Sequence, residues 1–287
     1  AERLTARIQA KPPAPTLYHR LQLSCEVLGD PGRQEFLWDK EGSHKPLQRG
    51  PSSVLHFHSF NKSHLGTYSC TATGPQGTAV ATYNLQINDL VHKVFVFPQE
   101  TKDSHVLLRA QPGQPLQTLT LCLRSYSDLA RPHGLFSYAT RAQANEVLLF
   151  KPKPSAYEFH IGGKFVIFTI PLGAAPSQQH VCASWESATG IVQFWLDGRA
   201  WPRKGLQKGY RVGAEAAIVL GQDQDSFGGS FDAKQSFVGE ISSVYLWDVV
   251  LSASAVKAAM EDTPYEAPIF GWRNFPYRAV GEVYLKP

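Results

Sequence analysis

Hydrophobic and aromatic residues occur in short runs that Gly, Pro, Asn and Asp interrupt through nearly the whole chain. This spacing is typical of the strands and turns of β-sandwiches and barrels. One stretch, residues 252–261, has a helix-forming composition and begins with serines that can cap a helix. The pattern therefore predicts an all-β protein with one helix.

Composition excludes several classes of protein. Of the 287 residues, 43% are hydrophobic and 18% are charged, which is enough apolar material for a core and excludes intrinsic disorder. The longest uncharged apolar run, residues 165–176, is far shorter than the roughly 18 residues that suggest a membrane span. The net charge of +4 is too small and too dispersed for a nucleic-acid-binding surface. The chain opens without a signal-peptide pattern, so we expect a mature, processed form.

The cysteines predict the cellular compartment. Cys25 and Cys70 lie in the first third of the chain, and Cys122 and Cys182 lie in the middle. An even count in two groups favours one disulfide in each of two domains and an oxidising compartment. A zinc site would need closely spaced pairs such as C-x-x-C, which the sequence lacks. We therefore expect a secreted, extracellular protein, and the sequon at Asn61 predicts N-glycosylation.

The beginning of the chain carries the marks of an immunoglobulin domain. Trp38 follows Cys25 at a distance that lets an indole pack on a disulfide. Tyr68 precedes Cys70 by two residues, which is the tyrosine-corner position. These residues resemble those of Fc-receptor-like or I/C2-type immunoglobulin domains. The resemblance implies a sandwich over residues 1–88 with a Cys25–Cys70 disulfide, and it leaves room for a protein partner of this domain.

From residue 89 onward the chain resembles the pentraxin family, most closely its short plasma type. The resemblance is carried by KVFVFP at 93–98, LCLRSYSDL at 121–129, HVCASWES at 180–187 and GEVYLKP at 281–287. The third segment fits the family signature H-x-C-x-[ST]-W-x-S. The resemblance implies a two-sheet jelly-roll over residues 89–287 with one long helix at 254–261. It also implies a Cys122–Cys182 disulfide and assembly into a cyclic, usually pentameric, homo-oligomer.

Residues 223–235 have the most distinctive chemistry. Three carboxylates and two amide side chains lie there, beside paired glycines that let the backbone turn sharply. Calcium takes six to eight oxygen ligands, which Asp, Gln and backbone carbonyls on a loop can provide. The stretch is not an EF-hand, because Phe227 and Lys234 occupy two of that motif's ligand positions. From the loop alone, a polar turn with capping aspartates is an equally good interpretation.

The resemblance to pentraxins implies that this loop and an earlier one hold up to two adjacent calcium ions. The residues at the family's ligand positions are Asn145, Asp223, Gln224 (through its backbone carbonyl), Asp225, Asp232 and Gln235. Ala144 stands where the family has an Asp, which removes one carboxylate from the first ion. Asp223 replaces a longer Glu that bridges both ions. We therefore expect the first ion to bind more weakly than in relatives.

The same resemblance defines a ligand pocket beside the ions. Pentraxins that recognise phosphocholine place an aromatic residue and an acid there, and the acid faces the choline cation. Phe150 keeps the aromatic position, His160 takes the intervening polar position, and Phe165 stands where the acid is expected. Cation–π contacts of about 0.5–2 kcal/mol would then be all that holds a quaternary ammonium. Anionic groups such as phosphoethanolamine, a carboxylate or a cyclic sugar acetal are favoured, and core packing is an equally good interpretation of Phe165.

No catalytic pattern is present. The sequence lacks the E-x-D-x-x-E, G-x-S-x-G and H-E-x-x-H motifs, so we expect no enzyme. The favoured function is that of a secreted, calcium-dependent pattern-recognition protein of innate immunity. Its ring of identical sites would bind glycan or phospholipid head groups multivalently. The alternatives are a calcium-independent adhesion or interaction module with a decayed site, an ectodomain piece of a receptor, and a glycan-cleaving enzyme.

Overall fold

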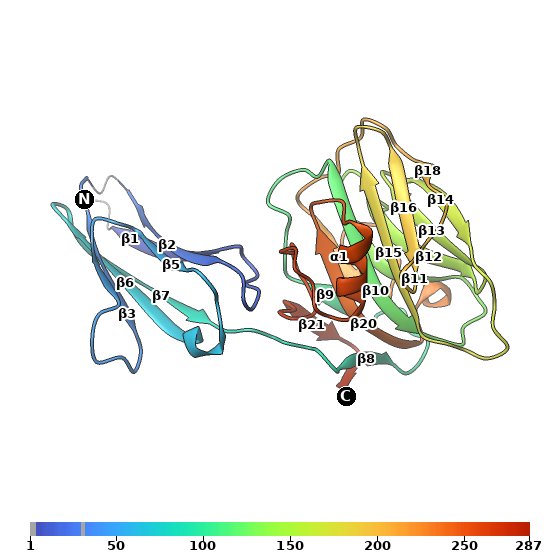
Figure 1. Cartoon of the computed structure of the whole chain (residues 1–287), viewed down its shortest axis with the longest axis horizontal. Helices are drawn as coiled ribbons and strands as arrows, with labels where there is room; N and C mark the ends of the chain where they lie inside the picture. The colour runs from blue at the N-terminus through green and yellow to red at the C-terminus, as the bar shows by residue number, and fades with distance from the viewer. Residues whose placement is uncertain (1–3, 30–31) are drawn as a thin grey trace. The chain divides into compact units, whose positions relative to one another are not determined.

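The computed structural model describes residues 4–29 and 32–287, and the chain divides into two compact units, Ala1–Asn88 and Asp89–Pro287 (Figure 1). Both units are built almost entirely from β-strands, and the described residues contain one α-helix, α1 (Ala253–Met260). The prediction of an all-β protein with one helix is therefore confirmed. The helix has eight residues. It begins after Ser252, whose Oγ accepts a hydrogen bond from the backbone N–H of Ala255.

The first unit is a sandwich of two antiparallel sheets, with the strand orders β1-β2-β5 and β4-β3-β6-β7. The strands are β1 (Thr5–Lys11), β2 (Leu21–Leu28), β3 (Glu35–Lys40), β4 (Gln48–Gly50), β5 (Val54–Phe57), β6 (Gly66–Gly74) and β7 (Gly77–Leu85). A short 3₁₀ turn, η1 (Lys62–His64), precedes β6.

The core of the first unit is built around its disulfide, which joins Cys25 of one sheet to Cys70 of the other. Trp38 lies beside Cys70 in the neighbouring strand and has no exposed surface. The Tyr68 hydroxyl donates a hydrogen bond of 2.5 Å to the backbone carbonyl of His64. This bond is the tyrosine corner of immunoglobulin domains. The predicted immunoglobulin sandwich and its disulfide are confirmed.

The second unit consists of two larger antiparallel sheets. The first has the order β17-β16-β15-β10-β20-β8-β22, with β18 paired to β16, and the second has the order β14-β13-β12-β11-β19-β9-β21. The strands of the first sheet are β8 (Val94–Phe97), β10 (Thr118–Tyr126), β15 (Gln179–Glu186), β16 (Ile191–Leu196), β17 (Arg199–Ala200), β18 (Lys204–Gly205), β20 (Gly239–Trp247) and β22 (Tyr284–Lys286). Those of the second are β9 (His105–Leu108), β11 (His133–Ala139), β12 (Val147–Lys153), β13 (Ala156–Ile161), β14 (Lys164–Thr169), β19 (Ala217–Leu220) and β21 (Tyr277–Val280).

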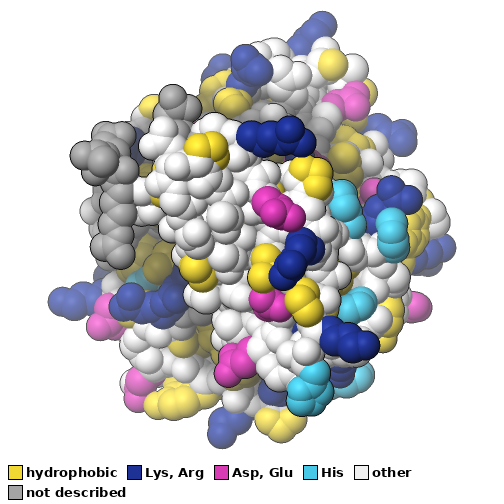
Figure 2. Space-filling model, turned by 90° about the vertical axis from the view of Figure 1, so that its left-hand side faces the viewer, with side chains coloured by type: hydrophobic (Ala, Val, Ile, Leu, Met, Phe, Trp, Pro, Cys, Tyr) yellow, Lys and Arg dark blue, Asp and Glu magenta, His cyan; other side chains and the backbone are white. Residues whose placement is uncertain are grey.

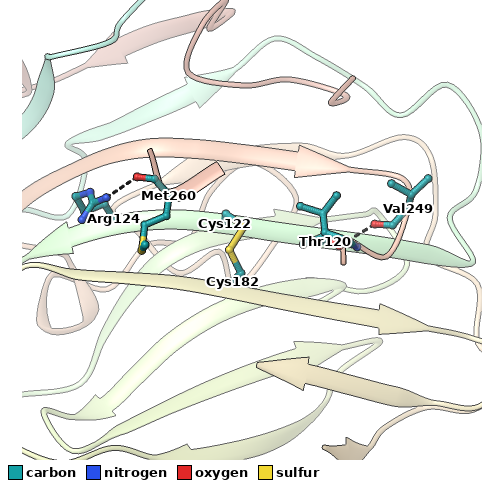
Figure 3. Close-up of a disulfide and its surroundings, with 7 residues drawn as sticks. Thr120, Cys122, Arg124, Cys182, Val249 and Met260 are labelled. Atoms are coloured by element: carbon teal, nitrogen blue, oxygen red, sulfur yellow. Dashed lines mark hydrogen bonds between the residues drawn. A yellow bond between two sulfur atoms is a disulfide. The ribbon is translucent and has the colours of Figure 1, made fainter. Parts of the chain in front are cut away.

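A disulfide joins two neighbouring strands of the first of these sheets. Cys122 of β10 and Cys182 of β15 are directly opposite in the register and are bonded to each other (Figure 3). Further along β10, the Arg124 guanidinium donates a hydrogen bond of 2.7 Å to the backbone carbonyl of Met260 (Figure 3). This bond ties the last residue of α1 to the sheet. The disulfide implied by the pentraxin resemblance is therefore confirmed.

Charge is dispersed on the face of the molecule that Figure 2 shows. Lys and Arg side chains lie scattered over it, with Asp and Glu side chains among them. This arrangement agrees with the net charge of +4 and differs from the basic stripe of a nucleic-acid-binding surface. Within residues 4–29 and 32–287, no helix is both long enough and apolar enough to cross a bilayer.

The tyrosine corner gives a prediction for the stability of the first unit. Tyr68→Phe removes only the hydroxyl that bonds to the carbonyl of His64, so we expect the unfolding free energy to fall by about 1 kcal/mol. Urea unfolding of a chain limited to residues 1–88 measures this through Trp38, the sole tryptophan in that segment. Tyr18→Phe is the control, because Tyr18 is 72% exposed. Equal stability of the Tyr68→Phe chain and the unmodified chain would contradict the prediction.

Candidate calcium and ligand site

The candidate ligand pocket lies on the outer face of the sheet that contains β12, β13 and β14. Residues directly opposite each other in an antiparallel pair share a face. Phe150 lies opposite Glu158, and His160 lies opposite Phe165. Alternate residues of a strand point to the same side, so Glu158 and His160 also share that face. All four side chains therefore lie on one side of the sheet, and the hydrophobic core lies on the other.

The loop that follows β19 is folded back onto this sheet by the side chain of Gln224. Its Nε2 donates to the backbone carbonyls of Ser137 in β11 and Ala217 in β19, at 3.0 and 2.9 Å. Its Oε1 accepts a hydrogen bond of 2.8 Å from the backbone N–H of Gly228. The side-chain amide of Gln224 is thus fully used in holding the loop, which leaves its backbone carbonyl as the group for a cation.

Two further contacts fix the loop near the residues that precede β12. The Arg141 guanidinium lies over the ring of Phe227, 4.3 Å from the ring centroid. Arg141 belongs to the same β11–β12 connection as Asn145, so the two candidate ligand loops touch. A Cβ atom at Gly134 would lie 3.1 Å from the backbone nitrogen of Asp223. The glycine therefore allows the loop to pass close to β11.

Three side-chain oxygens of the predicted ligand residues are buried and accept no hydrogen bond from the described residues. They are Oδ1 of Asn145, Oδ1 of Asp223 and Oε1 of Gln235. Buried polar atoms without a partner are rare in folded proteins, so each needs an explanation. Carboxylate and amide oxygens are the ligands that calcium prefers. The donor set at this site therefore fits a calcium ion.

Negative charge is concentrated around Asp223. Its side chain is only 7% exposed, and burial raises the pKa of its carboxyl from the ordinary value of 3.8 to about 7. The neighbouring carboxylates of Asp225 and Glu158 contribute to this raised pKa in that order. A bound divalent cation would offset the repulsion among the three carboxylates.

Asp232 caps a short 3₁₀ turn, η2 (Ala233–Gln235). Its Oδ1 accepts a hydrogen bond of 2.9 Å from the backbone N–H of Lys234. The capping interpretation of the loop is thus correct for this one aspartate. The cap uses a single carboxylate oxygen, so it is compatible with the predicted role of Asp232 as a calcium ligand.

The structure places the three predicted pocket residues together and corrects one interpretation of Phe165. This residue is 48% exposed, so its interpretation as a core residue is wrong. Its ring stacks on the His160 imidazole, with the centroids 4.7 Å apart and the planes at 26°. Phe150 is 8% exposed and lies two strands away from Phe165 on the same face.

The sequence comparison with pentraxins overlooked Glu158. Its Oε1 lies 2.9 Å from Nε2 of His160, and its carboxylate also acts on Asp223. The face therefore carries an acid, although position 165 does not. Alternate residues of a strand point to the same face, and Glu158 precedes His160 by two residues. This spacing was the sequence signal that could have identified Glu158 as a residue of the site.

Two further groups of residues lie elsewhere in the chain, a cysteine–histidine cluster and the predicted glycosylation site. The ligand atoms of Cys122, His180 and Cys182 lie within 4.8 Å of one another, as in a metal site. The two sulfurs are bonded to each other, however, and no described cysteine is free, so no thiolate is available. Asn61 caps η1, and its Oδ1 accepts a hydrogen bond of 2.9 Å from the N–H of Ser63. Glycosylation of Asn61 stays a prediction.

Comparison with known proteins identifies the family. The model of the Pentaxin family matches residues 93–287, and that of an immunoglobulin domain matches residues 7–74. C-reactive protein of Homo sapiens is 46% identical over 202 residues, which are 69% of this chain and 89% of that protein. Serum amyloid P-component of Homo sapiens is 46% identical over 199 residues, with the same coverage of 69% and 89%.

A solved structure supports the same fold. The native heptameric SAP-like pentraxin from Limulus polyphemus superposes with a TM-score of 0.60 over 70% of this chain and 96% of that one, at 23% identity. The fold is thus an immunoglobulin-like sandwich followed by a pentraxin jelly-roll. The chain belongs to the Pentaxin family, which confirms the resemblance seen in the sequence.

The raised pKa of Asp223 gives a prediction for the pH dependence of stability. A carboxyl whose pKa is higher in the folded than in the unfolded state favours folding below the unfolded pKa, and this contribution is lost as pH rises through the folded pKa. At about 1.4 kcal/mol per pKa unit, ionisation of Asp223 lowers the unfolding free energy by up to about 4 kcal/mol between roughly pH 4 and pH 8. Asp223→Asn abolishes this loss.

Urea unfolding at a series of pH values in a buffer with chelator measures the difference. We expect the Asp223→Asn chain to gain stability over the unmodified chain progressively as the pH rises. Asp128→Asn controls for the loss of one negative charge, because Asp128 is an exposed aspartate of the same unit. Parallel pH profiles for Asp223→Asn and the unmodified chain would refute the prediction.

Proposed function

We propose that this protein is a secreted, calcium-dependent recognition protein whose second unit binds head groups on foreign or damaged surfaces, and that it is not an enzyme. The observation that carries the proposal is the set of three buried, unpartnered oxygens on the two adjoining loops. Membership of the Pentaxin family supports it. The residues that would hold calcium are Asn145, Asp223, Gln224 through its carbonyl, Asp225, Asp232 and Gln235.

The outer face of the sheet would orient the head group. Bound calcium supplies the positive charge to which a phosphate or carboxylate of the ligand binds. Phe150 offers an apolar surface beside the site, and Glu158 lies directly opposite it in the register. Stacked against His160, the half-exposed Phe165 extends this surface outward. The face therefore suits a ligand with an anionic group and an amine or ammonium group a few bonds apart.

The acid at position 158 revises the expectation drawn from the sequence. Because Phe165 stands at the family's acid position, the sequence suggested that only cation–π contacts would bind a quaternary ammonium group. The carboxylate of Glu158 would add a charge pair, and it is only partly exposed, with 15% of its side chain accessible. Charged contacts gain strength as they are removed from water. We therefore include phosphocholine with phosphoethanolamine among the head groups that this site would bind.

We further propose a cyclic homo-oligomer, as in the heptameric pentraxin from Limulus polyphemus, and a pentamer is the size that we expect. Several identical sites on one ring convert weak contacts into avidity, which can exceed the affinity of a single site roughly 10²–10⁴-fold. The immunoglobulin domain would then be free to take a protein partner.

Calcium binding is the decisive test of the proposed function. On a phosphoethanolamine column, we expect retention in calcium and elution by chelator, with retention lost in Asp223→Asn and kept in the Asp128→Asn control.

Isothermal titration should show a strong and a weak calcium site. Ala144→Asp should strengthen the weak site about tenfold, because it adds a carboxylate. Two equally tight sites in the unmodified chain would refute the role of Ala144. Retention that chelator leaves unchanged would favour the calcium-independent adhesion module.

Glu158 gives a separate prediction about ligand choice. Glu158→Gln keeps the shape of the side chain and removes its charge. We expect the affinity for phosphoethanolamine to fall about tenfold, which is about 1.4 kcal/mol. The affinity for ethyl phosphate, which lacks the amine, should stay unchanged. Competition for elution from the column in the presence of calcium measures both affinities. An equal loss for the two ligands would show that Glu158 acts on the calcium ions instead of the amine.

A further inference from the structure

A cavity of about 250 Å³ lies at one end of the jelly-roll, on the inner side of the sheet that contains β11 and β12. Two pairs of polar residues line it. Ser125 and Gln179 are directly opposite in one sheet, and His133 and Lys151 are directly opposite in the other. Lys151 follows Phe150 in β12, so its side chain points away from the outer face of the sheet, which carries Phe150. The Lys151 ammonium donates a hydrogen bond of 3.2 Å to Oε1 of Gln179, which links the sheets.

Lys151 is a buried cation without a charged partner. The residue is 9% exposed, and its ammonium forms no ion pair with any carboxylate of the described residues. The ring of Tyr157 partly compensates, because the ammonium lies 4.4 Å from its centroid. Burial lowers the pKa of Lys151 to about 8, so the amine remains mostly protonated at neutral pH. A charge held in such a place is stabilised by an anion.

Gln179 adds a second donor to the cavity. Its Oε1 accepts hydrogen bonds from both the Lys151 ammonium and the Tyr157 hydroxyl, and these two bonds fix the orientation of the amide. Its Nε2 therefore points away from the Lys151 ammonium and the Tyr157 hydroxyl. The cavity thus offers N–H donors on an ammonium and on an amide.

We propose that this cavity binds a small organic anion, whose carboxylate or phosphate group pairs with the Lys151 ammonium and accepts a hydrogen bond from Nε2 of Gln179. The rest of the lining includes the apolar side chains of Leu129, Pro154, Leu172 and Pro176. It also includes the exposed Asp128, whose carboxylate forms no ion pair with Lys151. A short alkyl chain on the anion would cover the apolar side chains. The volume lies below the usual range of about 300–1,000 Å³ for ligand pockets, which limits the ligand to a few heavy atoms beyond its charged group.

This site is distinct from the proposed calcium site. The two lie on opposite faces of the same sheet, and the cavity shares no residue with the candidate calcium ligands. Its ligand is therefore expected to bind in calcium-free buffer. That condition separates the two proposals, because a failure of either one leaves the other standing.

Binding of butyrate to the full chain tests the proposal. Ligand-observed NMR in calcium-free buffer should show saturable binding with a dissociation constant of about 1 mM. Ethyl phosphate in a parallel titration distinguishes a phosphate from a carboxylate as the preferred group. Neutral 1-butanol, which has the same alkyl length, should bind at least tenfold more weakly. No saturable binding of either anion, or equal binding of the alcohol, would overturn the proposal.

Three variants locate the binding. Gln179→Glu keeps the shape of the side chain and gives Lys151 a carboxylate of its own, so the affinity for butyrate should fall at least tenfold. Lys151→Gln should have the same effect. Lys153→Gln is the control on the same strand, because Lys153 is exposed and should leave binding unchanged. Unchanged binding in Gln179→Glu, with its fold verified by circular dichroism, would overturn the proposal.

Discussion

The two-residue alternation of β12 and β13 separates two groups of chemically distinctive side chains in the pentraxin jelly-roll. Phe150, Glu158 and His160 point outward. Lys151 and Tyr157, one position away in each strand, point inward to the cavity between the sheets. One sheet thus separates a face suited to cations from a cavity suited to anions, and a shift of the register by a single residue would exchange them.

Both sites depend on polar groups that the fold holds out of water. On the outer face, burial and neighbouring carboxylates raise the pKa of Asp223, so the ionised site is unfavourable until a cation offsets it. On the inner face, the ammonium of Lys151 has one hydrogen bond and one aromatic ring as its compensation. Groups of this kind reduce stability by themselves and gain it when a ligand of opposite charge binds only the folded state.

The sequence was sufficient for the fold, because its evidence is local or paired. Cys25, Trp38, Tyr68 and Cys70 define the immunoglobulin core at fixed spacings, and the pentraxin segments predict the second disulfide and the helix. The sites were only partly predictable, because they depend on register. The register of the β12–β13 hairpin determines that Phe150 faces Glu158. The packing of the two sheets determines that Lys151 meets Gln179 across the interior. The sequence also could not show that Phe165 is exposed, since its apolar neighbours suit a buried strand equally well.

The acidic residues on the outer face of the sheet that contains β12 and β13 differ from the pattern expected for the family. Ala144 lacks the carboxylate expected for the first calcium ion, and Phe165 lacks the one expected for the ligand's cation. Glu158 brings one carboxylate back, at a position where it acts on Asp223 and bonds to His160. A single acid that lies opposite Phe150 and acts on Asp223 cannot fully replace two. Under the proposed function, calcium affinity and cation recognition would therefore be coupled through Glu158. The preference for amine-bearing head groups would then depend on how completely the metal ligands alone satisfy the ions.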